Sequence, residues 1–253
     1  MIDAIKSEFL KLTTIRTMYG LLAGVVALLA LQVVATILSA GSQPGSPTLD
    51  DPSTVRGVWG ASGGATILVL TMGIIVMTSE YRHMTITSTF LTTPVRGRVL
   101  VAKLVTSAVA GVLVGVMCVA FVVALASALL PIKEHATVPT STIVAISAGA
   151  VLAYAIYGIL GVALGALIRI QPLAIMIAVV FVFIAEPLIA ALFPRIGRWL
   201  PGSATNAILQ APGFGNFTES DYLPLAGAAL LLIFYALVFA LIASRTTLRR
   251  DIT

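Results

Sequence analysis

The sequence predicts an all-α integral membrane protein with six transmembrane helices, because its composition is strongly apolar and its apolar residues are gathered in long segments. Hydrophobic residues make up 59% of the 253 residues, and charged residues make up only 10%. A soluble domain usually carries about 25% charged residues, since its surface must face water. The chain has too little charge to cover a globule of this size. Lipid is therefore the expected solvent for much of the surface.

Six apolar segments are each long enough to cross a bilayer, which takes about 20 mostly apolar residues. Charged residues, proline or glycine bound each of them. The segments are 18–40, 58–78, 104–130, 143–168, 172 to about 185 or beyond, and 223–243. The fifth is the least regular, because Glu186 and Pro187 interrupt it and more prolines and arginines follow. We expect the whole chain to form one transmembrane domain.

The placement of basic residues predicts the orientation, because cytoplasmic loops are enriched in lysine and arginine. With the N-terminus inside, 11 of the 15 lysines and arginines fall on the cytoplasmic side. The other four, on the outer side, are Arg56, Lys133, Arg195 and Arg198. Both termini are therefore expected in the cytoplasm. The positive charge is explained by this topology and by contact with anionic lipid head groups, so no nucleic-acid partner is expected.

The N-terminal residues 1–16 are predicted to form an amphipathic helix along the inner membrane interface. Ile2, Ile5, Phe9 and Leu12 recur at helical spacing, while charged residues fall mostly on other faces. A helix of this kind buries its apolar face at the level of the head groups. The alternative is a plain solvated extension of the first transmembrane helix.

The sequence carries no motif of nucleotide or metal chemistry. The phosphate-binding pattern G-x-x-x-x-G-K-[ST] does not occur, so we expect no ATP binding by this chain. His83 and His135 fall on opposite sides of the predicted membrane and cannot share a metal ion. Glycine pairs at 60/64, 111/115 and 161/165 have the four-residue spacing that lets helices approach closely. They are expected to serve internal packing, with a dimer face as the alternative.

The loop 79–103 is the most informative part of the chain. It is polar, about 25 residues long and contains Pro94 near its end, whereas a simple connection between two helices could be far shorter. Ile86, Phe90 and Leu91 form a short apolar stripe on an otherwise polar helix. The length and the pattern indicate more than a connection between two helices. The alternative is an interfacial helix whose arginines reach toward the membrane surface.

The same loop resembles that of the permease subunits of ABC-2 type transporters. The resemblance lies in E-Y-R-H-x-T-I from Glu80, in T-x-P-x-R ending at Arg96, and in A-K ending at Lys103. The rest of the chain agrees in its amphipathic N-terminus, its six spans and its basic C-terminal tail. The resemblance implies the inner membrane of a bacterium. It also implies short re-entrant helices between the fifth and sixth spans, in segment 187–222.

The resemblance further implies a function and partners. In the family this loop forms a coupling helix that docks on a separate ABC ATPase subunit, which binds ATP and Mg²⁺. Two permease chains, identical or related, form the translocation path for export. The implied coupling residues are Glu80, Tyr81, Arg82, His83, Thr85, Ile86, Phe90, Pro94, Arg96 and Lys103. No catalytic residue, metal or cofactor is expected in this chain itself, and a drug, antibiotic or lipid-like compound is the expected substrate.

Glu186 is the one acidic residue predicted at membrane depth. Such a carboxylate marks a functional site by default, because its burial is costly unless it is paired. A place in the substrate path is one interpretation. The other is that Glu186 caps the re-entrant element near the outer interface, with Arg195 or Arg198 as partner. Two further functions stay open: an ion-coupled secondary transporter, and a membrane scaffold or sensor that transports nothing.

Overall fold

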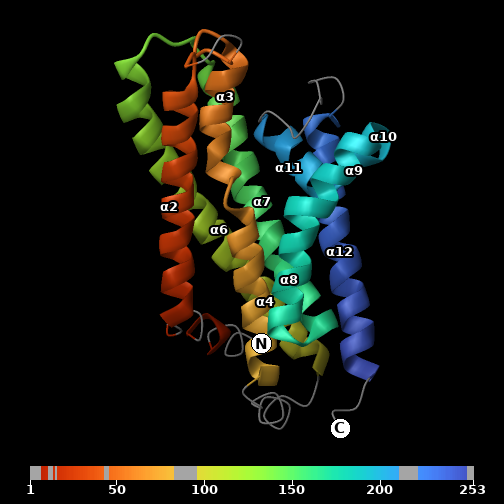
Figure 1. The fold of residues 1–253 in the computed structure, drawn as a ribbon. Coiled ribbons are helices and arrows are strands. Elements are labelled where there is room, and N and C mark those ends of the chain that lie inside the picture. The colour runs from red at the N-terminus through yellow and green to blue at the C-terminus, as the bar shows by residue number, and fades with distance from the viewer. Residues whose placement is uncertain are drawn as a thin grey trace.

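The computed structural model describes residues 7–10, 14, 16–42, 46–82, 96–210 and 222–249, and regular structure in these ranges is entirely helical (Figure 1). Six described helical segments are long and apolar enough to cross a membrane. They are Arg16–Ser39, Pro52–Arg82, Val99–Ile132, Thr140–Ile168, Gln171–Leu192 and Leu225–Arg245. The prediction of an all-helical, multi-pass membrane protein is thereby confirmed. The described ends, residues 7–10 and the end of the last helix, lie at the same end of the bundle.

The helices of the first four spans are longer than the apolar segments that predicted them. They are α2 (Arg16–Ser39), α3 (Pro52–Gly60), α4 (Thr66–Arg82), α6 (Arg96–Leu129) and α7 (Thr140–Ile168). The second span is built from α3 and α4, joined by a short 3₁₀ turn at Ala61–Gly63. Asp51 caps the start of α3, and its side chain accepts a hydrogen bond from the backbone N–H of Ser53. This hydrogen bond lowers the pKa of Asp51.

Helix α7 lies at the centre of the bundle and packs against α4, α6 and α12 (Leu225–Arg249) (Figure 1). Glycines make these contacts close. A Cβ atom added at Gly161 would collide with the backbone carbonyl of Leu70 on α4. One added at Gly111 on α6 would collide with the carbonyl of Tyr154 on α7. The pairs 111/115 and 161/165 therefore serve packing between helices of the same chain, as predicted.

The fifth span differs from the sequence prediction, because Glu186 and Pro187 do not end it. Helix α8 (Gln171–Val180) continues through a π turn (Phe181–Ala185) into α9 (Glu186–Leu192). Proline has no backbone N–H and clashes with the preceding turn, and it is tolerated in the first turn of a helix. The wider π turn lets α9 begin anew with Pro187 in that position. The apolar helix thus runs past this interruption to Leu192.

Two short helices follow the fifth span, α10 (Pro194–Gly197) and α11 (Pro201–Leu209). They lie with α3 and α9 at the end of the bundle opposite the described chain ends (Figure 1). They occupy part of the predicted segment 187–222, of which residues 211–221 lie outside the described residues. A re-entrant position of these helices in the membrane stays a prediction. The same holds for the interfacial N-terminal helix, since Ile2, Ile5 and Leu12 also lie outside the described residues.

Candidate functional site

A buried ion cluster joins three segments at the end of the bundle where the described chain ends lie. The Nζ atom of Lys103, near the start of α6, lies 2.7 Å from Oε2 of Glu8 and 2.9 Å from Oε1 of Glu80. Glu8 belongs to the described N-terminal residues 7–10, and Glu80 lies on the last turn of α4. All three side chains are almost completely buried. The cluster therefore holds the N-terminal segment, the end of α4 and the start of α6 together.

The energetics of this cluster make it a strong constraint. Moving a charged group out of water costs several kcal/mol, and a partner recovers that cost only with close and well-directed contacts. A lysine ammonium offers three N–H donors, so it can serve two carboxylates at once. Removing one member of a buried ion pair leaves an uncompensated charge and costs about 3–5 kcal/mol. The three segments are therefore expected to move as one unit.

Tyr81, next to Glu80 at the end of α4, contacts the end of the central helix α7. The guanidinium carbon of Arg169 lies 5.5 Å from the centre of the Tyr81 ring, a cation–π arrangement. Arg169 ends α7 in the left-handed conformation, with a φ of 60°, and its backbone N–H bonds to the carbonyl oxygen of Gly165. The residues around Glu80 thus contact both the ion cluster and the end of α7.

The structure brings some of the predicted coupling residues together. Glu80 and Lys103 share the ion cluster, Tyr81 packs beside Arg169, and Arg82 is exposed at the end of α4. The backbone of Arg96 starts α6. The remaining predicted residues, His83, Thr85, Ile86, Phe90 and Pro94, lie outside the described residues.

Sequence reasoning missed Glu8 and Arg169 as members of this site. A signal for Glu8 was present in Lys103, a lone cation near the start of a long apolar helix. Such a lysine needs carboxylate partners when it is buried, and the acidic residues of the N-terminal segment were candidates. Arg169 gave no comparable signal, because basic residues are ordinary in cytoplasmic loops.

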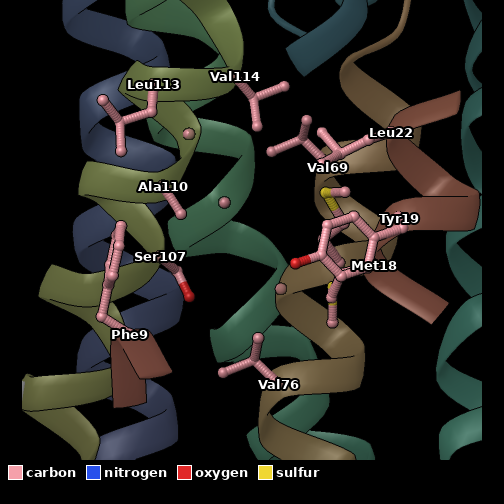
Figure 2. A pocket seen from close by; sticks show the side chains of 14 residues that line it. Phe9, Met18, Tyr19, Leu22, Val69, Val76, Ser107, Ala110, Leu113 and Val114 are labelled. Atoms are coloured by element: carbon pink, nitrogen blue, oxygen red, sulfur yellow. The ribbon is translucent and has the colours of Figure 1, made fainter. Parts of the chain in front are cut away.

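An apolar pocket of about 190 Å³ lies beside the ion cluster, between α2, α4 and α6, with α7 behind it (Figure 2). Phe9, the neighbour of Glu8, lies on the α6 side together with Ser107 and Leu113. Met18 and Tyr19 lie on the opposite side. Ser107 follows Lys103 by about one helical turn, so the N-terminal segment and α6 each contribute to both the ion cluster and the pocket.

Glu186 occupies a second buried polar site, at the other end of the bundle. Its side chain is buried on the first turn of α9, and its Oε1 atom accepts hydrogen bonds from the backbone N–H groups of Gly202 and Ser203. These groups belong to the first turn of α11, where unpaired N–H groups and the helix dipole favour an anion. Arg198 lies instead over the ring of Trp199, at 5.5 Å from its centre. The carboxylate thus caps α11.

A cavity of about 460 Å³ adjoins Glu186. Its walls come from α2, the α3–α4 junction, the π turn before α9, α9 itself and α11. Its lining mixes polar and apolar side chains, namely Gln32, Thr36, Ile67, Tyr157, Val182, Phe183, Glu186, Thr205, Asn206, Leu209 and Tyr222. The cavity is polar enough to hold water and large enough to hold more than water.

A scan against protein-family models finds no match for this chain. A search of the curated proteins likewise finds no match. The fold and the two sites define a multi-pass helical membrane protein with a buried ion cluster at one end of the bundle and a polar cavity at the other.

Proposed function

We propose that this chain is the membrane-spanning permease subunit of an ATP-binding cassette exporter. A separate ATPase chain docks on the loop 79–103, binds ATP and Mg²⁺, and drives the transport. Two permease chains, identical or related, enclose the translocation path. The exported compound is a drug, an antibiotic or a lipid-like molecule, and the loop faces the cytoplasm together with both termini.

The observation that supports this proposal best is the pairing of Glu80 with Lys103. These two residues end the predicted loop 79–103, and the structure places them in the helices on either side of it, since α4 extends to Arg82 and α6 begins at Arg96. A loop that only connects two helices gains nothing from a buried ion cluster, because the burial of charge is costly. A loop that transmits force from a partner must be fixed firmly to the helices that it moves. The cluster provides this fixation at both ends of the loop.

Glu8 and the Tyr81–Arg169 contact extend the same argument. Glu8 fixes the N-terminal segment to the base of the loop, and Tyr81 connects the base to the central helix α7. Because α7 packs against α4, α6 and α12, a displacement of the loop would be passed directly to the core of the bundle. In this proposal the partner binds the loop, and the bundle responds as a unit.

An ion-coupled secondary transporter is the second candidate, and the buried carboxylate of Glu186 favours it. Such transporters place ionisable side chains along several spans. Among the described residues the fully buried charged side chains are Glu8, Glu80, Lys103 and Glu186. Three of them form the ion cluster, which leaves Glu186 as a single candidate for ion coupling. The ATP-driven exporter therefore accounts for more of the structure.

The test is to produce the chain together with candidate ABC ATPases of the same cell and to purify any complex through a tag on the permease. We expect the two chains to be recovered in equal amounts and to hydrolyse ATP. Transport into proteoliposomes that depends on a sodium or proton gradient, and not on ATP, would favour the second candidate instead.

A further inference from the structure

We propose that the cavity beside Glu186 binds an organic ammonium ion, with the Glu186 carboxylate as its counter-charge. This inference rests on the proposed function in so far as it names the class of exported compound. The binding itself requires only this chain. The helices α3, α9 and α11, which line the cavity, lie at the end of the bundle opposite the end of α4 and the start of α6 (Figure 1). An exported compound would be held there before its release.

The first argument is that Glu186 is a buried carboxylate with an unused oxygen atom. Oε1 accepts both hydrogen bonds from α11. Among the described residues, none donates a hydrogen bond to Oε2 and no lysine or arginine forms an ion pair with Glu186. A buried carboxylate without a cation is expensive, and two backbone N–H groups compensate only part of its charge. The site therefore favours a ligand that brings a positive charge and N–H donors.

The second argument comes from Gln32, on another wall of the same cavity. Its side-chain carbonyl oxygen is buried and has no hydrogen-bond partner among the described residues. A buried acceptor that is left unsatisfied costs about 1–3 kcal/mol. Gln32 lies on the α2 wall of the cavity and Glu186 on the α9 wall. The Gln32 oxygen itself is buried against Gly64, so Oε2 of Glu186 is the acceptor that remains for a ligand. A primary or secondary ammonium group carries the donors that this oxygen lacks.

The size and the apolar part of the lining separate an organic cation from a bare metal ion. Ligand pockets for drug-sized molecules have volumes of roughly 300–1,000 Å³, and this cavity has about 460 Å³. A single water molecule occupies only about 30 Å³ in the liquid. Val182, Phe183 and Leu209 give the cavity apolar surface, which suits the hydrocarbon part of an amphiphilic amine. A sodium ion would use none of this surface.

Gly202 shows how closely the carboxylate is held in place. A Cβ atom added at Gly202 would lie 2.8 Å from the carboxyl carbon and from both carboxylate oxygens of Glu186. The charge is thus fixed against α11 before any ligand arrives. Such preorganisation lowers the cost of binding, because little side-chain freedom remains to be lost.

The experiment measures the binding of monodansylcadaverine, a fluorescent primary amine, to the purified chain in nanodiscs of zwitterionic lipid. N-acetyl monodansylcadaverine, which has the same fluorophore but no charge, is the matched ligand. We expect the amine to bind at least about tenfold more tightly than the acetylated compound, as a charge-assisted hydrogen bond in a buried site allows. Equal binding of the two compounds would overturn the proposal.

Variants then assign the binding to this cavity. Glu186→Gln should weaken amine binding at least about tenfold. The matched control is Glu134→Gln, the same change at an exposed residue of the loop before α7, and it should bind as the wild type does. If Glu186→Gln does not fold, Ala35→Phe serves instead, because Ala35 is an exposed residue of α2 that lines the cavity away from α11. Wild-type binding by either variant would refute the assignment.

Sodium is tested in the same samples. We expect amine binding to be equal in sodium chloride and in N-methylglucamine chloride. A rise in unfolding temperature that requires both sodium and Glu186, without amine binding, would replace the organic cation by sodium and overturn the proposal. All these measurements omit the ATPase, so their failure would leave the permease function standing. Conversely, amine binding by a chain that forms no complex with an ATPase would refute only the proposed function.

Discussion

The Nζ atom of Lys103 lies 2.9 Å from Oε1 of Glu80, although the two residues stand at opposite ends of the loop 79–103. The contact closes the base of the loop inside the bundle, where both side chains are buried. Glu8 completes the cluster from the N-terminal segment. The ion cluster should affect both the stability of the folded chain and the stimulation of the partner ATPase, and the two effects can be measured separately.

Lys103→Met should destabilise the folded chain by about 3–5 kcal/mol, because it removes the buried cation that Glu8 and Glu80 both contact. The neutral triple variant Glu8→Gln, Glu80→Gln, Lys103→Met should recover most of this loss, since no buried charge remains. Thermal unfolding in detergent measures both. An unfolding temperature of Lys103→Met equal to that of the wild type would show that the cluster contributes little to stability.

Gly161→Ala should destabilise the chain by about 1–3 kcal/mol, the usual cost of overpacking. The new methyl group would collide with the backbone of Leu70 on α4, which cannot move aside as a side chain could. Gly20→Ala on α2 is the matched control, because no atom lies within 4 Å of the added Cβ. The control should be neutral or slightly more stable, since alanine favours helix over glycine. The same unfolding assay compares the two, and equal behaviour would contradict the close packing of α4 on α7.

The distribution of basic residues predicts that the C-terminus is cytoplasmic. A reporter enzyme that is active only outside the cytoplasm should therefore be inactive when it is fused to the C-terminus. The same reporter inserted in the loop between α6 and α7, near Lys133, should be active. The reverse pattern would overturn the orientation, and with it the position of the loop 79–103.

The apolar stripe of the loop predicts a difference between two variants. Phe90→Ala should weaken the recovery of the ATPase with the permease more than Arg98→Ala does, because buried aromatic anchors dominate such interfaces and rim charges contribute less. Both variants should still insert into the membrane. The measurement is the amount of ATPase that co-purifies with each variant. Wild-type recovery with Phe90→Ala would favour an interfacial helix that faces lipid.

The fold could be predicted from the sequence because the bilayer imposes a simple rule on the length and polarity of each span. The fifth span shows where this rule stops. A carboxylate and a proline at Glu186 and Pro187 interrupt the apolar sequence. The helix nevertheless continues beyond them, through the π turn at Phe181–Ala185. A π turn has no clear pattern in composition, so it becomes visible only when the backbone is known.

The candidate sites were predictable in part for a similar reason. Glu80 and Lys103 were expected to belong to one functional loop, but not to touch, because a contact over 23 positions depends on how α4 and α6 pack on α7. For Glu186 the sequence left a cap and a place in the substrate path open, and its donors Gly202 and Ser203 depended on the position of α11. Gln32 gave no signal, since a single glutamine in an apolar helix indicates no partner.

The most direct test of the account is ATP hydrolysis by the partner ATPase, measured with and without this chain in nanodiscs. We predict that the chain alone hydrolyses no ATP and that its addition raises hydrolysis by the ATPase several-fold. Lys103→Met should remove the increase. The neutral triple variant shows whether a stable contact between α4 and α6 is enough to raise hydrolysis without the buried charges. Two results would contradict the proposal that this is the permease of an ATP-driven exporter. One is ATP hydrolysis by the isolated chain. The other is an ATPase that does not bind the chain and whose hydrolysis rate does not change when the chain is added.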